Sequence, residues 1–362
     1  MKKILLISNM YPSKKFPHYG SFVKNTEDIL LENGYFVRKV VLHKTNNKLK
    51  KLYNYIIFYF KTIFKGIFFS FDCLYAHYAS HTALPLLIIK KLKPNLKIIM
   101  NVHGNDVVPE DDHDEKYIPM VKKILKQSYK VICPSTYFEE ILKRDYLIPN
   151  NKIVIYPSSG IDMANFKEYD KKDSKKQISL DVNYHYIGYI SRIEKDKGWN
   201  LFLEAINKIK KQLPQDIKFL VIGSGNEEEK YNQLVKKYQL ENLIIKKDFL
   251  PQSLLVYAYN SLEIFCFPTY RKSESLGLVG LEAMSCKIPV IASNMGGPKT
   301  YIKSYENGFL FEPQNSDDLA KKILEVLNYS DLNEIKDNAY QTAMKYDKNV
   351  IKNILIDIFS QI

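Results

Sequence analysis

The sequence lacks the features of a membrane-spanning or disulfide-stabilised protein. No run of about 18 uncharged apolar residues occurs in its 362 residues, so no transmembrane helix is expected. The apolar stretch from Ile4 to Ile7 is too short for the core of a signal peptide. The four cysteines lie far apart without a C-x-x-C pair, which argues against a disulfide framework and against a cysteine-ligated zinc site. These absences favour a cytoplasmic protein.

Acidic residues are missing from one long segment, between Glu32 and Asp72. The basic residues of this segment are Arg38, Lys39, Lys44, Lys48, Lys50, Lys51, Lys61 and Lys65. The formal net charge of +13 lies entirely within residues 1–180, whereas residues 181–362 carry equal numbers of basic and acidic side chains. A lysine-rich composition explains an abundance of lysine but not its segregation. The asymmetry therefore favours an anionic partner, either a membrane surface or a nucleic acid.

The same segment is densely aromatic and aliphatic over residues 52–60 and 63–69, and Lys61 and Lys65 share one helical face. We interpret residues 38–69 as a region that binds an anionic membrane surface through an interfacial helix, which places the protein on the inner face of the cell membrane. A helix that only packs on its sheet is the alternative, and a span with two central lysines is costly. No helix-turn-helix or basic-aromatic sheet pattern is present, so no nucleic-acid partner is expected.

Short apolar runs alternate with helical segments throughout, which predicts an α/β fold with parallel sheets. The expected strands are residues 3–8, 36–42, 73–77, 97–102, 130–133, 184–190, 218–222, 243–246, 263–267 and 289–292. The charged stretch over residues 166–176 interrupts the alternation and is interpreted as a linker. Two Rossmann-like domains with parallel sheets facing across a cleft are therefore predicted, over residues 1–170 and 171–345. Residues 346–362 are predicted to form a helix that packs across the domain junction.

The most informative local pattern is a pair of glutamates around a helix start. A loop carrying Glu274 follows a predicted strand, and the next helix carries Glu282. The first N–H groups of that helix, at Gly277, Leu278 and Val279, form a candidate anion site. Carboxylates on both sides of an anion site suit a nucleotide sugar, which has hydroxyls at both ends and phosphates in the middle. Two ordinary surface glutamates are the alternative, but Glu282 stands among apolar neighbours.

Glu274 and Glu282 lie in the string Glu-Ser-Leu-Gly-Leu-Val-Gly-Leu-Glu-Ala-Met. This string resembles the E-x7-E signature of family 4 (GT4) retaining glycosyltransferases, which have the GT-B fold. The resemblance implies that Glu274 contacts the hydroxyls of the donor sugar and that Glu282 binds the ribose.

Arg192 and Lys197 lie five residues apart at the end of the first predicted strand of the second half. An arginine fork and a lysine point charge can together hold a diphosphate, although a solvated charged loop is the ordinary interpretation of such a stretch. The string from Ser191 to Gly198 resembles the Gly-Arg…Lys-Gly motif of the same family, with Ser191 in place of the usual glycine. The resemblance implies that Arg192 and Lys197 neutralise the leaving diphosphate.

Further segments resemble family motifs along most of the chain. Gly223 falls where the family places the loop that lines the donor pocket, and Phe249 and Leu250 fall at the position of nucleobase contact. Gly20, at a predicted helix start, would let the backbone approach a phosphate. His103, in a His-Gly-x-Asp loop, would face the cleft and donate a hydrogen bond to the sugar or on the acceptor side.

The resemblance implies a retaining hexosyltransferase whose first domain, residues 1–170, binds the acceptor and faces the membrane, and whose second domain, residues 171–345, binds the nucleotide sugar. The enzyme would move a sugar from a nucleotide sugar, most often UDP-linked in this family, to a lipid-linked or polysaccharide acceptor in the synthesis of a cell-surface glycan such as capsule or O-antigen. No metal or other cofactor is expected, because Arg192 and Lys197 supply the cations. Asp112-His113-Asp114 matches the D-x-D metal motif of GT-A enzymes but lies in an acidic run, so it is interpreted as a solvated loop.

Two other functions remain open on the sequence alone. A GT-B-like UDP-sugar 2-epimerase would need acid and base side chains at the sugar C2 and would act without an acceptor. A non-catalytic, membrane-associated protein that binds nucleotide sugars is the third possibility. The presence of Glu274, Glu282, Arg192 and Lys197 together argues against loss of catalysis.

Overall fold

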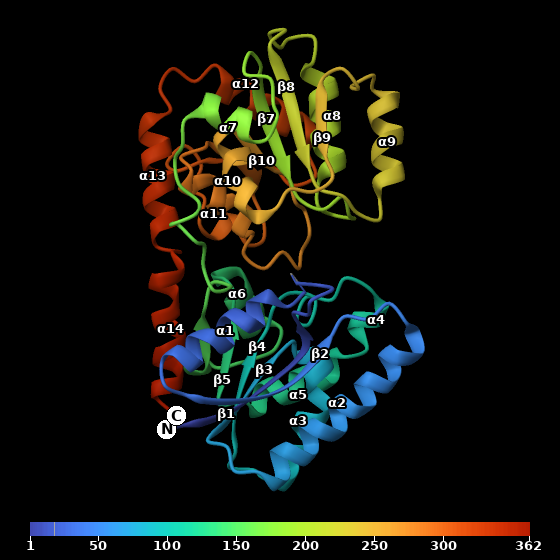
Figure 1. The fold of residues 1–362 in the computed structure, drawn as a ribbon, viewed down its shortest axis with the longest axis vertical. Helices are drawn as coiled ribbons and strands as arrows, with labels where there is room; N and C mark the ends of the chain where they lie inside the picture. Colours follow the sequence, from blue (N-terminus) through green and yellow to red (C-terminus); the bar gives the residue numbers. More distant parts are fainter. Residues whose placement is uncertain (18) are drawn as a thin grey trace. The chain divides into compact units, whose positions relative to one another are not determined.

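A computed structural model describes residues 1–17 and 19–362 (Figure 1). The chain divides into two compact units. The first contains residues 1–159 and 349–362, and the second contains residues 160–348. This division differs from the predicted boundary at residues 170 and 171, and it assigns the end of the chain to the first unit.

The first unit is built on a six-stranded parallel sheet with the strand order β2-β1-β3-β4-β5-β6. Its elements are β1 (Lys3–Tyr11), α1 (Ser21–Glu32), β2 (Phe36–His43), α2 (Lys48–Phe68), β3 (Cys73–His77), α3 (Ala79–Leu92), β4 (Lys97–Asn101), α4 (Asp112–Glu115), α5 (Ile118–Gln127), β5 (Lys130–Cys133), α6 (Thr136–Arg144), a 3-10 turn (Asn150–Lys152), β6 (Ile153–Ile155) and α14 (Lys348–Ser360).

Helices cover both faces of this sheet because successive residues of each buried strand point to opposite sides. Leu5 and Ile7 of β1 belong to a core shared with α2, α3, α5 and α6. Ile4 and Leu6 of the same strand belong to a second core shared with α1 and α14. The two chain ends meet beside this second core, where the Lys2 ammonium donates to the backbone carbonyls of the last helical turn (Figure 1).

The second unit repeats the architecture, with a six-stranded parallel sheet of order β12-β11-β10-β7-β8-β9. Its elements are α7 (Lys171–Gln177), β7 (His185–Ile190), α8 (Trp199–Ile209), β8 (Ile217–Ile222), α9 (Glu228–Lys237), β9 (Ile244–Lys247), α10 (Gln252–Asn260), β10 (Leu262–Phe267), α11 (Leu278–Ser285), β11 (Val290–Ser293), a 3-10 turn (Pro298–Thr300), β12 (Phe309–Phe311), α12 (Ser316–Leu327) and α13 (Asn333–Met344). One face packs against α10, α11 and α13, with α7 lying against α10, and the other face packs against α8, α9 and α12.

The charged stretch interpreted as a linker is an integral part of the second unit. The Asp170 side chain caps α7 by accepting a hydrogen bond from the N–H of Asp173. Lys175 is buried despite its charge, because its ammonium donates to the carbonyls of Val182 and Tyr184. The linker prediction is therefore wrong. The charged composition of this stretch gave no sign of a capped helix, in which the ammonium group of Lys175 is hydrogen-bonded to backbone oxygens.

Helix α2 is amphipathic with an unusual exposed side. Phe58, Thr62 and Gly66 are its buried residues, and they share one face. Large apolar side chains also follow its outer side, and α3 adds more. The exposed members are Leu49, Leu52, Tyr53, Ile56, Phe60, Phe64 and Phe68 on α2, and Leu84, Ile88 and Leu92 on α3. Over the described part of the chain, no helix combines the length and the hydropathy needed to cross a membrane.

The buried side of α14 generates a prediction about stability. Leu355 is fully buried in the core of the first unit, whereas Val350 on the same helix is 50% exposed. Leu355→Ala should lower the unfolding free energy of the first unit by ~2–5 kcal/mol, because it leaves a cavity. Val350→Ala should change it by less than ~0.5 kcal/mol. Urea denaturation measures both, and equal effects would contradict this packing of α14.

Candidate active site

Two loops of the second unit, one after β7 and one after β10, are held together by backbone contacts. The N–H of Tyr270 donates to the carbonyl of Asp196 over 2.9 Å. Gly198 has a φ of 79°, and a Cβ atom there would lie 1.9 Å from the carbonyl oxygen of Pro268. Only glycine allows this approach. Beneath the loop, the buried hydroxyl of Tyr189 lies 3.2 and 3.3 Å from the carbonyl oxygens of Arg192 and Lys197.

This contact brings Lys197 and Glu274 together. The Lys197 Nζ lies 2.7 Å from the Glu274 Oε2, and the two side chains are only 11% and 12% exposed. The hydroxyl of Thr269 donates to the same carboxylate oxygen over 3.1 Å. Burial opposes ionisation of Glu274, but the Lys197 charge and the two hydrogen bonds outweigh it and hold the pKa of this carboxyl below its usual value. At neutral pH the site therefore holds a charge-balanced pair.

Glu282 lies inside α11 in a different environment. Its Oε2 accepts a hydrogen bond from the hydroxyl of Tyr259, on α10, over 2.8 Å. Burial raises the pKa of Glu282 to about 7, and the hydrogen bond from Tyr259 opposes that rise only partly. The two glutamates of the motif therefore differ: Glu274 is ionised at neutral pH, and Glu282 is near its titration point.

The start of α11 lies close to both carboxylates. Gly277 caps the helix with a φ of 78°, and a Cβ there would lie 2.5 Å from the ring of Phe267. The hydroxyl of Tyr301 donates to the carbonyl of Gly277 over 2.9 Å. Burial raises the pKa of Tyr301, and the negative charges of Glu274 and Glu282 both add to the rise, so the Tyr301 hydroxyl lies in the electrostatic field of both carboxylates. The N–H groups of the first helical turn, which include those of Leu278 and Val279, have no acceptor within the helix.

Arg192 is more exposed than Lys197. Its guanidinium donates to the Glu194 carboxylate over 2.8 Å, and its side chain is 60% exposed. The Gly223 backbone packs on the same loop, since a Cβ there would lie 1.9 Å from the carbonyl oxygen of Ser191. The glycine of this turn is therefore required by a contact between two loops of the protein.

The two residues predicted to meet the nucleobase follow β9. Phe249 is 66% exposed, so its ring is available to a ligand. Leu250 is partly buried and packs against the core of the second unit. Their environments therefore differ, and of the two only the ring of Phe249 is free of the core.

His103 belongs to the first unit and is paired with a second histidine. Its Nε2 lies 3.0 Å from the Nδ1 of His77, and the two rings stack with centroids 5.2 Å apart. Burial lowers the pKa of His103 to about 3, and burial followed by the His103 charge lowers that of His77 as well. Both imidazoles are therefore neutral at pH 7. Asp106 organises the loop by accepting from the N–H groups of His103 and Gly104, and it also accepts from Ala79 at the start of α3.

Gly20 caps α1 with a φ of 77°. A Cβ at this position would lie 2.6–2.7 Å from backbone atoms of Met10 and Tyr11 at the end of β1. The glycine is thus required where the chain passes close to β1. That requirement exists whether or not a phosphate binds there.

Several contacts of the site were not predicted from the sequence. Tyr259 donates a hydrogen bond to Glu282, and Thr269 donates one to Glu274. Tyr301 holds the carbonyl of Gly277 at the start of α11, and His77 positions His103. Tyr259, Tyr301 and His77 belong to no recognisable spacing, because each reaches the site from another element, whereas Thr269 lies in the same loop as Glu274. Among residues 1–17 and 19–362, no group of three or more His, Cys, Asp or Glu side chains could hold a metal ion. Asp112 to Glu115 form one helical turn, α4, where a loop was expected.

Comparison with known proteins finds a glycosyltransferase family model for each of the two units. Residues 170–342 match the family model described as "Glycosyl transferases group 1", and residues 18–164 match "Glycosyltransferase Family 4". Among curated proteins, an uncharacterized glycosyltransferase of Methanocaldococcus jannaschii is 27% identical over 95% of both chains. The capsular polysaccharide biosynthesis glycosyltransferase CapM of Staphylococcus aureus is 31% identical, over 52% of this chain and 49% of CapM.

Solved structures show the same fold at low identity. The sucrose-phosphate synthase of Thermosynechococcus elongatus aligns with a TM-score of 0.80 at 19% identity, over 100% of this chain and 99% of the other. Anabaena HepE in complex with UDP aligns with a TM-score of 0.79 at 17% identity over 100% of both chains. The chain therefore belongs to the group 1 and family 4 glycosyltransferases and has their GT-B fold of two Rossmann-like domains.

Proposed function

We propose that this protein is a retaining hexosyltransferase that uses a UDP-sugar donor and a lipid-linked or polysaccharide acceptor in cell-surface glycan synthesis. The observation that carries the proposal is the buried pair of Lys197 and Glu274 beside the start of α11. Two relatives support the finer assignments. CapM is named for capsular polysaccharide biosynthesis, and HepE has been solved with UDP and with UDP-glucose.

In this proposal each end of the donor meets one glutamate. Glu274 accepts hydrogen bonds from the hexose hydroxyls, and Glu282 accepts them from the ribose. The diphosphate lies between them, at the N–H groups of Leu278 and Val279, where the helix dipole favours negative charge. Phe249 covers the nucleobase. Gly20 and Gly223 let the backbone approach the donor, and His103 contacts the sugar or the acceptor.

The reaction needs no nucleophilic side chain. The bond between the sugar C1 and the diphosphate oxygen breaks, and Arg192 and Lys197 stabilise the charge that develops on the leaving diphosphate. A diphosphate oxygen takes the proton of the acceptor hydroxyl while the new C1–O bond forms on the same face, which gives retention. Because the protein supplies two cations, we propose that catalysis is independent of a metal ion.

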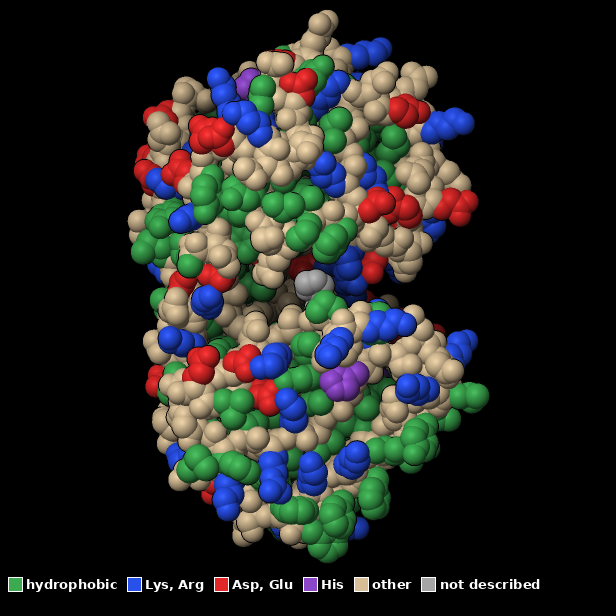
Figure 2. Space-filling model, in the orientation of Figure 1, with side chains coloured by type: hydrophobic (Ala, Val, Ile, Leu, Met, Phe, Trp, Pro, Cys, Tyr) green, Lys and Arg blue, Asp and Glu red, His purple; other side chains and the backbone are tan. Residues whose placement is uncertain are grey.

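We also propose that the first unit docks on the inner face of the cell membrane. The exposed apolar residues of α2, such as Leu49 (80% exposed) and Phe68 (71%), are of a size that inserts into a lipid interface. Lysines accompany them along the same helix, and the segment between Glu32 and Asp72 has no acidic residue. Figure 2 shows basic and apolar side chains gathered along the lower margin of the first unit, where Figure 1 places α2.

Substitution of the two cations tests the mechanism. Arg192→Ala and Lys197→Ala should each lower kcat on the order of 10²–10³-fold, because each removes a fixed charge beside the leaving group. Glu274→Gln should also lower kcat but leave UDP affinity nearly unchanged. The exposed Lys195→Ala is the matched control and should be nearly neutral. UDP release from a panel of UDP-hexoses measures all four.

Activity that is insensitive to Arg192 and Lys197, or abolished by EDTA, would refute the metal-free mechanism. Conversion of a UDP-sugar without an acceptor to the 2-epimer would establish the epimerase alternative.

The raised pKa of Glu282 predicts a pH dependence of UDP binding. The ribose hydroxyls donate to the ionised carboxylate, so binding below pH 7 requires loss of a proton. UDP affinity should therefore be constant above about pH 7 and fall as the pH is lowered through that value. Glu282→Gln should bind UDP more weakly and lack this step. Calorimetric measurement of UDP affinity for both proteins over a range of pH isolates the contribution of Glu282, because protonation of UDP itself affects both proteins equally.

The membrane proposal predicts a salt-sensitive association. Wild type should sediment with phosphatidylglycerol vesicles but not with phosphatidylcholine vesicles. Binding should fall with salt, as the Debye length shrinks from about 10 Å at 0.1 M to about 3 Å at 1 M. Replacing Lys48, Lys50, Lys61 and Lys65 by Gln should release the protein. Replacing four exposed lysines of the second unit, Lys211, Lys236, Lys237 and Lys321, should not. Equal sedimentation of both variants would disprove specific docking by α2.

A further inference from the structure

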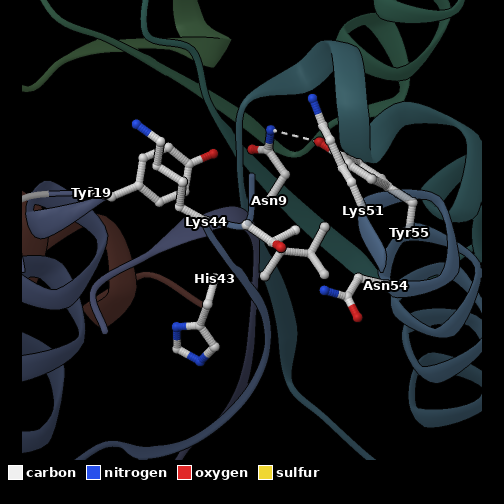
Figure 3. Close-up of a pocket in the computed structure, with 9 residues that line it drawn as sticks. Asn9, Tyr19, His43, Lys44, Lys51, Asn54 and Tyr55 are labelled. Carbon is white, nitrogen blue, oxygen red and sulfur yellow. Dashed lines mark hydrogen bonds between the residues drawn. The ribbon is translucent and has the colours of Figure 1, made fainter. Parts of the chain in front are cut away.

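A polar pocket opens in the first unit at the carboxyl ends of β1 and β2 (Figure 3). Its volume is about 150 Å³. The residues that line it are Asn9, Tyr19, Leu42, His43, Lys44, Thr45, Lys51, Asn54 and Tyr55. Ligands of parallel α/β sheets bind at the carboxyl ends of strands. None of the residues assigned above to the donor site lines this pocket, so it is available to a different ligand.

Asn9 supplies a buried hydrogen-bond acceptor. The residue is only 6% exposed, and its Oδ1 has no hydrogen-bond partner among the described residues. Its Nδ2 lies 3.5 Å from the Tyr55 hydroxyl, and Figure 3 shows the amide oxygen turned to the other side. A buried carbonyl oxygen without a donor is costly to maintain. The geometry therefore fits a ligand that brings a hydroxyl group.

Two lysines supply positive charge on either side of Asn9 in Figure 3. The Lys44 ammonium lies 5.2 Å from the ring centre of Phe16 and 5.9 Å from that of Tyr19. Within the part of the chain that the structure describes, neither Lys44 nor Lys51 has a carboxylate at ion-pair distance. Two cations without a protein counterion favour an anion, and phosphate is the anion that lysine binds as a point charge.

We propose that this pocket binds the acceptor as a phosphorylated saccharide. A sugar hydroxyl donates to the Asn9 Oδ1, and the phosphate lies against Lys44 and Lys51. The inference rests on the proposed glycosyltransferase function and adds the chemical class of the acceptor. That class has two sources, a free sugar phosphate and a sugar joined to a lipid through phosphate.

A neighbouring groove favours the lipid-linked source. Its volume is about 480 Å³, and it shares Leu42, His43 and Asn54 with the pocket. The groove runs between β2 and α2. Its apolar lining comes from Val40, Val41, Ile57, Phe58, Phe60 and Phe64, and its basic lining comes from Lys39, Lys61 and Lys65. A hydrocarbon chain that leaves the phosphate can therefore follow α2, whose outer side carries the exposed apolar residues described above.

The test is a ligand-observed NMR titration of the full chain with its donor site saturated by UDP. The probes are the 1-phosphates of glucose, galactose, N-acetylglucosamine and N-acetylgalactosamine, and inorganic phosphate. At least one sugar phosphate should bind, and Lys44→Gln/Lys51→Gln should weaken it by at least about tenfold. Lys48→Gln/Lys50→Gln removes the same charge from the same segment without touching the pocket, and it should bind as wild type does.

Asn9→Leu separates the sugar contact from the phosphate contact. It should weaken the sugar phosphate but leave the affinity for inorganic phosphate unchanged. Circular dichroism and UDP binding check that each variant is folded. If no sugar phosphate binds, or if the two double variants bind equally, the proposal is overturned.

The outcomes also separate this inference from the proposed function. Failure of wild type to bind UDP would refute the donor assignment, whereas normal UDP binding without sugar-phosphate binding would refute only the acceptor pocket. An octyl diphosphate ester of the bound sugar identifies the source. At least about tenfold tighter binding than the sugar 1-phosphate supports a lipid-linked acceptor, and equal binding supports a free sugar phosphate.

Discussion

The buried ion pair of Lys197 and Glu274 is the constraint on which the proposed donor site depends. Removing two charges from water costs several kcal/mol per ion, so such a pair adds little to stability by itself. Its geometry is maintained by backbone contacts between the two loops, above all at Gly198 and at the hydrogen bond from Tyr270 to Asp196. A pair that is costly and yet rigidly built is better explained by preorganised catalysis than by stability.

A second consequence follows from the different environments of the two glutamates. Lys197 and Thr269 stabilise the ionised form of Glu274, whereas Glu282 has only the Tyr259 hydroxyl to offset burial. One motif thus contains a carboxylate that is permanently charged at neutral pH and one that titrates near pH 7. A ligand that donates hydrogen bonds to Glu282 would replace the solvent that burial has removed, which would couple binding of that ligand to proton release.

The two proposals for the first unit concern two sides of helix α2. The face of α2 that packs on the sheet is buried, and the opposite side is apolar although it is exposed. The lysines between Glu32 and Asp72 also form two sets. Lys39, Lys44, Lys51, Lys61 and Lys65 line the pocket or the groove, whereas Lys48 and Lys50 lie outside both. In the two proposals, a phosphorylated acceptor would contact the first set and an anionic membrane surface would contact the second, which gives one physical reason for the segregation of charge along the chain.

The sequence by itself determined the class of fold and the two parallel sheets, because buried parallel strands are read as continuous apolar runs. It located strands β3 and β5 to the residue. It also pointed to Glu274, Glu282, Arg192 and Lys197, whose spacing is local. It did not reveal β6, which is only three residues long, or the capped helix α7. Only the tertiary structure decided which residues of other elements contact the site: Tyr259 contacts Glu282, and His77 contacts His103. It also revealed that the Asn9 Oδ1 is buried without a hydrogen-bond donor among the described residues. Such contacts join residues far apart in the chain, and neither periodicity nor motif spacing carries that information.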